Sequence, residues 1–199
     1  MLLALARARH SVYLQTPNLT SRPLVRALAR ALARGVAVQV VTCRRMMVLE
    51  QFVTTAAQAS TEGCVAELLA CASSANGGEG GRLEVWFFTP PLDAEHEQGA
   101  AGGGHEAGEA WEGEDGPGED GAGDEGEGEV SPLAQHAVQS HVKALIVDGD
   151  VAVLGSANAD RASWFTSQEV NVAVFSHPFA RRVRRTLQRA LRGRLQRAT

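Results

Sequence analysis

The sequence has few of the residues that stabilise small secreted domains or anchor a chain in a bilayer. Its three cysteines, Cys43, Cys64 and Cys71, show no C-x-x-C spacing and no accompanying histidine pattern. We therefore expect buried free thiols rather than a disulfide framework or a zinc site. No apolar run approaches the roughly 20 residues of a transmembrane helix. Arginine interrupts the opening MLLALARARH too early for a secretory signal, which leaves a cytoplasmic or a peripheral membrane location.

Basic residues are absent from one long stretch of the chain. Between Asp93 and Glu129 there are fourteen acidic residues and no lysine or arginine, a charge of −14, while the remainder has nineteen basic and nine acidic residues, a charge of +10. A basic surface suits anionic partners such as phosphates, nucleic acid or anionic lipid. Residues 92–131 also lack the large apolar side chains needed to offset the entropy of ordering. We predict a disordered Gly/Glu-rich insertion there, within one domain built from residues 1–91 and 132–199.

Apolar periodicity in the rest of the chain predicts alternating strands and helices. The expected strands are 11–16, 36–43, 82–88, 140–148, 151–156 and 168–175, and the expected helices include one that ends at Gly35, one over 46–72 and a C-terminal one with an apolar stripe from Phe179 to Leu195. Asp148-Gly149-Asp150 is a strong signal for a tight hairpin. We predict an α/β fold, an α/β/α layered domain with a mixed central sheet.

Lysine occurs once, at Lys143, and the other eighteen basic residues are arginine. Arginine replaces lysine readily where a charge only contacts water, but a compact ammonium against a phosphate oxygen differs from a planar guanidinium in size and reach. His141 lies two residues earlier, and side chains at i and i+2 of a strand project from the same face. The pair indicates one phosphate site. Taken alone, an incidental His and Lys on a half-exposed strand would explain it equally well.

The pair belongs to a longer pattern, His141-x-Lys143-x4-Asp148-x6-Gly155-Ser156-x-Asn158. This pattern resembles the HKD motif of the phospholipase D superfamily at every position. The resemblance continues through RASWFTSQEVNV, where Glu169 falls on the acidic position of the family. SVYLQTPNL, followed by a helix and RGVAVQVVTC, is similar to the start of the second half of double-motif, phosphatidyltransferase-like members. The resemblance implies a phospholipase D-like fold.

The resemblance also implies catalytic roles for His141, Lys143, Asp148 and Glu169. A phosphodiester repels anionic nucleophiles, so a neutral His141 imidazole is a suitable nucleophile through a phosphohistidine, or the acid partner of one. Glu169 would orient the His141 ring. Asp148 is a motif member with a supporting role, and its place before a glycine makes it a turn former as well. The phosphate oxygens would be bound by Lys143, Ser156 and Asn158. The scheme requires no metal and no cofactor.

Double-motif members combine two His-Lys pairs, whereas one lysine allows only one half-site here, meaning one His-Lys pair with its supporting residues. We expect the complete site to need a missing N-terminal half or a second copy of the chain. The leading function is a phospholipase D-type phosphodiesterase or phosphatidyltransferase acting on a phosphodiester, in particular a phospholipid. A nuclease of the same superfamily and a catalytically silent phosphate-binding or oligomerisation module are the alternatives. The C-terminal helix, with eight arginines nearby, is either a solvated surface or a contact with a membrane surface.

Overall fold

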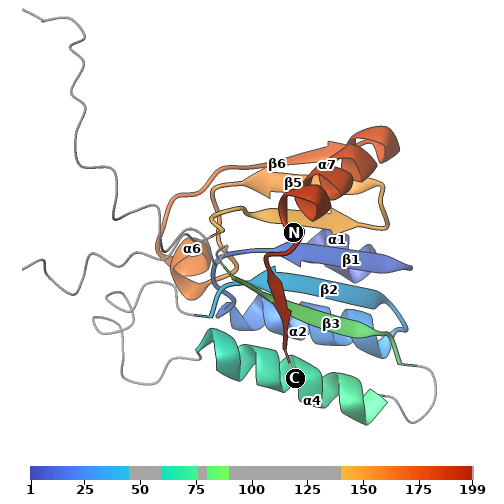
Figure 1. The fold of residues 1–199 in the computed structure, drawn as a ribbon, viewed down its shortest axis with the longest axis vertical. Coiled ribbons are helices and arrows are strands. Elements are labelled where there is room, and N and C mark those ends of the chain that lie inside the picture. The colour runs from blue at the N-terminus through green and yellow to red at the C-terminus, as the bar shows by residue number, and fades with distance from the viewer. Residues whose placement is uncertain (45–59, 76–79, 90–139, 199) are drawn as a thin grey trace, which may run out of the picture. The chain divides into compact units, whose positions relative to one another are not determined.

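A seven-stranded mixed sheet forms the centre of the computed structural model, which describes residues 1–44, 60–75, 80–89 and 140–198. The strand order is β6-β5-β4-β1-β2-β3-β7 (Figure 1). The strands are β1 Ser11–Gln15, β2 Ala37–Thr42, β3 Leu83–Phe88, β4 Ala144–Val147, β5 Val151–Gly155, β6 Asn171–Phe175 and β7 Leu195–Arg197. β1, β2 and β3 are parallel, and every other pairing is antiparallel. This confirms the predicted mixed sheet.

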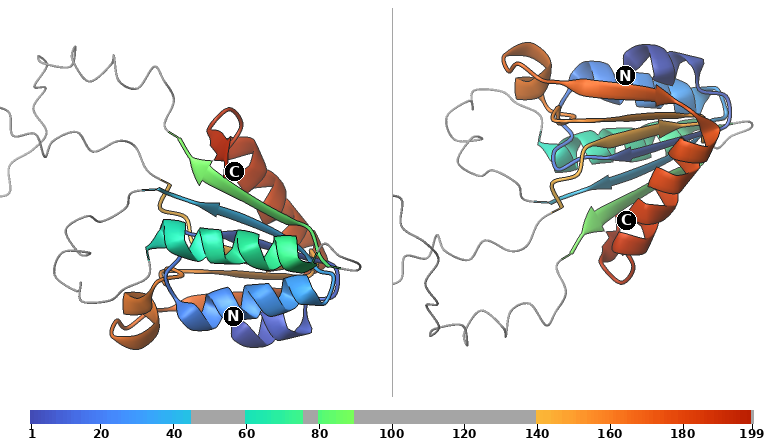
Figure 2. Two further views of the ribbon diagram at one scale, coloured as in Figure 1. Left: turned by 90° about the horizontal axis from the view of Figure 1, so that it is seen from below. Right: turned by 90° about the horizontal axis from the view of Figure 1, so that it is seen from above.

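Helices cover both faces of the sheet, which gives the predicted α/β/α layering (Figure 2). The helices are α1 Leu2–Arg7, α2 Arg22–Ala33, α4 Thr61–Ala75, α6 Arg161–Phe165 and α7 His177–Ala190. α1, α2 and α4 lie on one face, above a core that contains Leu28, Leu68 and Leu145, and α7 crosses the other face over Tyr13 and Ile146. The described residues all belong to one compact unit, Met1–Pro91 with Val138–Thr199.

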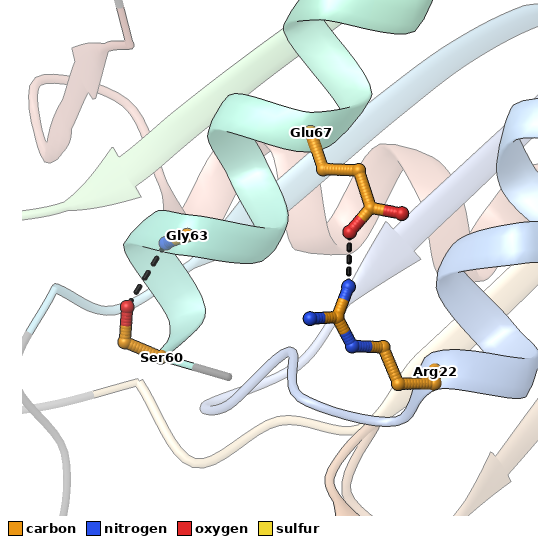
Figure 3. A network of polar contacts seen from close by, with 4 residues as sticks. All are labelled: Arg22, Ser60, Gly63 and Glu67. Atoms are coloured by element: carbon orange, nitrogen blue, oxygen red, sulfur yellow. Dashed lines mark hydrogen bonds and ion pairs between the residues drawn. The ribbon is translucent and has the colours of Figure 1, made fainter. Parts of the chain in front are cut away.

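Polar contacts join α2 to α4 at the end of the domain that contains the turn after β1. Arg22 at the start of α2 forms an ion pair with Glu67 of α4, and the Ser60 hydroxyl accepts a hydrogen bond of 3.0 Å from the Gly63 amide (Figure 3). Ser60 therefore caps the first turn of α4. The Leu19 amide donates to the Thr61 hydroxyl at 3.2 Å, so the turn after β1 is tied to the same helix.

The structure corrects three details of the sequence-based elements. β4 begins at Ala144, so His141 and Lys143 lie in the extended approach to the strand rather than inside it. The C-terminal helix ends at Ala190, because the chain turns through Gly193 at φ 71° and Leu195 then starts β7, which pairs with β3. Of the three free thiols, Cys71 is exposed and the other two are buried.

Two expectations fall on parts of the chain that the structure does not describe. The proposed insertion at 92–131 and the first part of the helix expected over 46–72 lie outside the described residues. Within the described ranges, no helix is long and apolar enough to cross a membrane.

Candidate active site

All motif residues except Asp148 lie where β1 ends and β4 begins, because the register places Gln15 opposite Ala144 and Ala144 opposite Leu154. Two loops are joined there. The amides of Thr20 and Ser21 both donate to the Ala159 carbonyl at 2.9 Å, and the Ala159 amide donates to the Thr16 hydroxyl at 2.9 Å. The turn after β1 therefore fixes the loop after β5, which contains the Ser-x-Asn part of the motif.

Lys143 and His141 are in direct contact, as their i, i+2 spacing predicts. The Lys143 ammonium lies 2.7 Å from Nδ1 and 2.9 Å from Nε2 of the His141 ring, and it also donates to the His141 carbonyl at 2.9 Å. An ammonium has only donors, so the ring nitrogen that accepts must be the one without a proton. The His141 side chain is exposed and Lys143 is half-buried, so the imidazole is open to an incoming ligand.

The charges of two carboxylates act on the Lys143 ammonium. Burial lowers the pKa of Lys143, and the nearby charges of Glu169 and Asp160 act in the opposite direction by favouring the ammonium. The structure thus brings Glu169 into the same site as Lys143, although its side chain forms no hydrogen bond among the described residues. These two charges offset part of the effect of burial, and on balance the pKa of Lys143 is lowered.

Asp160 is a site residue that the motif does not contain. It is 6% exposed and accepts hydrogen bonds from the Ser163 amide at 2.8 Å and from the Asn158 side-chain amide at 2.9 Å. Asn18 adds a weaker contact at 3.5 Å. Asp160 therefore caps α6 and orients Asn158 at the same time. An aspartate directly before a helical RASWF segment is the sequence signal that would have identified the cap.

Hydrogen bonds hold both the backbone and the side chain of Asn158. Its carbonyl accepts a hydrogen bond of 3.1 Å from the Trp164 indole, and its amide donates to the Ser163 hydroxyl at 3.1 Å. Its side-chain Oδ1 is buried without a hydrogen-bond partner among the described residues. The Asn158 side-chain NH2 group has two donors, and its hydrogen bond to Asp160 uses one of them.

Ser156 and Gly155 position the segment that contains Glu169. The Ser156 hydroxyl accepts from the Val170 amide at 3.1 Å and faces the Val170 carbonyl at 3.4 Å. A side chain at Gly155 would have its Cβ 2.3 Å from the Val170 carbonyl oxygen. Glycine is therefore required because β6 approaches the backbone of β5 so closely. In the described contacts Ser156 holds this loop in place.

Asp148 lies at the opposite end of β4 and is the motif member that the structure does not bring to the others. Its carboxylate accepts the backbone amides of Arg9, His10 and Ser11 at 2.8 to 2.9 Å. Burial favours the neutral acid, but these hydrogen bonds outweigh it, so the pKa of Asp148 is lowered. Asp148 has φ 54° and Gly149 has φ 70°, which confirms the tight hairpin.

Among the described residues, no group of three or more His, Cys, Asp or Glu side chains is arranged to hold a metal ion. The described part of the candidate site contains one imidazole, one ammonium, two carboxylates and one amide, contributed by the approach to β4, the loop after β5 and the loop before β6. This set combines a nitrogen nucleophile with donors for phosphate oxygens.

The family model for the cardiolipin synthase, PLD-like domain matches residues 1–82 and 119–191. The chain belongs to the phospholipase D superfamily. A curated relative, the minor cardiolipin synthase ClsB of Bacillus subtilis (strain 168), is 42% identical over 48 residues, which are 24% of this chain and 12% of that protein. The aligned part thus covers only a small fraction of this relative's length.

Solved structures share the phospholipase D-like fold at low sequence identity. Nuc from Salmonella typhimurium, a phospholipase D family member, has a TM-score of 0.57 and 15% identity, with 99% of this chain and 87% of that chain covered. Phosphatidylserine synthase from Haemophilus influenzae Rd KW20 has a TM-score of 0.55 and 13% identity, with 99% of this chain but 35% of that chain covered. At these identities the likeness establishes the fold of the phospholipase D-like domain.

Proposed function

We propose that the chain supplies one half-site of a phosphodiesterase or phosphatidyltransferase that acts on phospholipids through a phosphohistidine at His141. The observation that supports this most directly is the contact between the Lys143 ammonium and the exposed His141 ring. A phosphate bound by that ammonium would lie beside the imidazole, so nucleophile and phosphorus would be held together by one residue.

The reaction would proceed in two steps. In the first step a neutral ring nitrogen of His141 attacks phosphorus, the bond to the leaving alcohol breaks, and the leaving oxygen takes a proton from an acid. In the second step water or another alcohol attacks the phosphohistidine and gives up its proton, while the P–N bond breaks and the imidazole is restored. Water as acceptor gives hydrolysis, and an alcohol gives transfer.

The supporting residues would act on charge and orientation. Lys143 and Asn158 would donate to the non-bridging oxygens of the transferring group, and Glu169 would orient the imidazole. Ser156 would contribute by fixing the loop that contains Glu169. Asp148 would act as a supporting member of the motif from the far end of β4, by fixing the start of β1 to the hairpin.

A second half-site is proposed because the described chain has one ammonium and one exposed imidazole at the site. Large apolar side chains in the segments that flank Glu169 are exposed: the exposed fraction is 64% for Phe165, 76% for Val170 and 59% for Val172. Such exposure suits a contact with a further protein surface. We propose that this surface contacts a missing N-terminal half or a second copy of the chain, whose histidine would supply the acid.

Phospholipid is the favoured substrate because the matching family model and the curated relative are both named for cardiolipin synthase. A peripheral membrane location would accompany that substrate. The nuclease alternative rests on the basic α7, whose exposed arginines suit any polyanion. Comparing turnover of phosphatidylglycerol vesicles with turnover of a single-stranded oligonucleotide separates the two.

Trapping of the covalent intermediate tests the proposed nucleophile. An aryl phosphodiester has a good leaving group, so the first step depends least on the missing acid. After rapid quenching, mass spectrometry of a digest should find the phosphate adduct on the peptide that contains His141. His141→Asn should abolish the adduct, whereas His177→Asn, a change at another exposed histidine, should leave it. An adduct that persists in His141→Asn would refute the proposal.

A further inference from the structure

A cleft of about 440 Å³ lies between α7 and the sheet, at the end of the sheet opposite the candidate active site. Its lining includes Ser11, Ala37 and Arg82, near the starts of β1, β2 and β3, and Gly149 of the hairpin. Gln15 lies four positions after Ser11 along β1, about 13 Å at the usual rise of a strand. One phosphate therefore cannot contact this cleft and Lys143 together.

The cleft exists because the strands begin with small residues on the face of the sheet that α7 covers. Tyr13, Gln39 and Glu84 are aligned across neighbouring strands and share this face. The preceding residues on the same face, Ser11 and Ala37, are short. Gly149 has no side chain at all, and α7 passes above this end with its arginines. The volume is within the range of roughly 300–1,000 Å³ that is usual for small-molecule sites.

The lining is strongly basic. It contains four arginines and one glutamate, a net charge of +3: Arg82, Arg181, Arg184, Arg185 and Glu84. Glu84 is already paired with Arg82 at 2.6 Å. In the described part of the chain, no carboxylate forms an ion pair with the three α7 arginines that line the cleft, Arg181, Arg184 and Arg185. Three guanidinium groups on one helix thus face the cleft region without an acidic partner among these residues.

Arg184 is held in a fixed position within this group. Its guanidinium lies 4.0 Å from the centroid of the Tyr13 ring and donates to the Gln39 side chain, whose amide in turn donates to Glu84 at 3.3 Å. Its Nε is buried and has no hydrogen-bond partner among the described residues. Burial raises the pKa of Tyr13 to about 12, so the phenol stays neutral and does not balance the charge above it.

We propose that this cleft is a second phosphate-binding site, which takes the phosphate of a small phosphate ester or of a lipid headgroup. A guanidinium that is stacked on an aromatic ring and held by an amide is pre-organised for bidentate contact with phosphate oxygens. Arg181 and Arg185 lie on the same helix as Arg184, line the same cleft and would supply further positive charge. The site is independent of the chemistry proposed at His141.

Binding of inorganic phosphate to the full chain tests the site, and Lys143→Ala serves as the background that removes the candidate active site. Titration calorimetry at constant ionic strength should still find one phosphate bound. Arg181→Gln with Arg185→Gln should raise Kd at least tenfold. The matched control, Arg182→Gln with Arg189→Gln, changes the same charge on exposed positions of α7 outside the cleft and should change Kd less than twofold.

Three results decide the outcome. Loss of all phosphate binding with Lys143→Ala alone would overturn the proposal. An equal loss of affinity in the variant of Arg181 and Arg185 and in the control variant of Arg182 and Arg189 would also overturn it, because the loss would then reflect net charge alone. Arg184→Gln should also weaken binding at least tenfold, with thermal unfolding as the test of folding; if it does not fold, the exposed Arg181 and Arg185 pair decides.

Sedimentation with phosphatidylglycerol or phosphatidylcholine vesicles then identifies the source of the phosphate. A tenfold loss of phosphatidylglycerol binding in the Arg181 and Arg185 pair, with no loss in the control pair, assigns a lipid headgroup. Unchanged vesicle binding together with weakened binding of glycerol phosphate assigns a soluble ester.

Discussion

At the scale of single residues, the proposed site depends on the contact between the Lys143 ammonium and the His141 imidazole. Lys143→Arg keeps the charge, but a planar guanidinium cannot occupy the same space against His141 and one phosphate oxygen. In any assembly of the chain that is active, we expect this change to lower kcat about 100-fold or more. Steady-state kinetics on a phospholipid measure it.

A matched control is Arg161→Lys, an exposed position on α6 that makes the reverse exchange near the site. It should leave kcat within a few-fold of the wild type. If Lys143→Arg also stays within a few-fold, then Lys143 does not bind the transferring phosphate, and the inference drawn from its uniqueness is wrong.

Asp148 links the hairpin to the start of β1, and its lowered pKa predicts a dependence of stability on pH. Because the folded pKa is below the unfolded value of about 3.9, the stabilisation is present above that value and is lost as pH falls through the folded pKa. Asp148→Asn should lower the free energy of unfolding by about 1–2 kcal/mol at pH 7.

Urea unfolding of the wild type and of Asp148→Asn between pH 7 and pH 3 measures this difference. It should be constant down to about pH 5 and shrink below about pH 4, where Asp148 of the unfolded chain takes up a proton before Asp148 of the folded chain does. Asp150→Asn, at an exposed position of the same turn, removes the same charge together with an ion pair to His177 but none of the contacts to the start of β1, so it is the control for those contacts. A difference that is the same at every pH would mean that the carboxylate charge has no part in the contact.

Sequence alone identified His141, Lys143, Asn158 and Glu169 because their identities and spacing are local properties of the chain. It did not identify Asp160, which accepts a hydrogen bond from the side chain of Asn18, 142 residues away along the chain. For the same reason the sequence could not predict the hydrogen bonds that Asp148 accepts from three backbone amides. They lie 137 to 139 residues away along the chain.

At the scale of elements, the close approach of β5 and β6 positions the segment that contains Glu169. A Cβ at residue 155 would meet both the Val170 carbonyl and the Asn171 side chain at 2.3 Å. Gly155→Ala should therefore displace the start of β6, lower the free energy of unfolding by about 1–3 kcal/mol and reduce activity with it. Thermal unfolding and kinetics on the same preparation measure both effects.

Gly63→Ala is the comparison for the cost of removing a glycine where there is more room. The nearest atom to a Cβ at that position is the Ser60 hydroxyl at 3.2 Å, and the residue lies in a helix, where alanine is favoured. Gly155→Ala with wild-type stability and activity would show that β6 can move away without consequence for the site.

The elements themselves were largely predictable, because strands such as 11–15 and 144–147 are short apolar runs that a proline or a glycine follows closely. β7 was not predicted. Leu195 continues the i, i+4 stripe of α7 in the sequence, and it packs against the same core, but Gly193 turns the chain so that Leu195 pairs with Phe88. A periodic pattern cannot reveal a partner strand that lies about a hundred residues away.

At the scale of the whole molecule, the proposed half-site predicts that activity depends on association. With one histidine the first step must expel an alkoxide unless another group protonates it, and general acid catalysis of that kind contributes roughly 10²–10⁴-fold. The purified monomer should therefore be nearly inactive on a phospholipid with an alkyl leaving group. A single ammonium also provides only part of the positive charge that would stabilise the transferring group.

A protein dilution series, with mass in solution measured alongside turnover, tests this dependence. Specific activity should fall with the fraction of dimer, or appear only when an N-terminal half is added. In a dimer, mixing His141→Asn with wild type should give mixed dimers with one histidine, whose activity is lost like that of the pure variant. Specific activity that stays constant down to concentrations at which only monomer is present would contradict the half-site, because a single chain would then hold the nucleophile and the acid together.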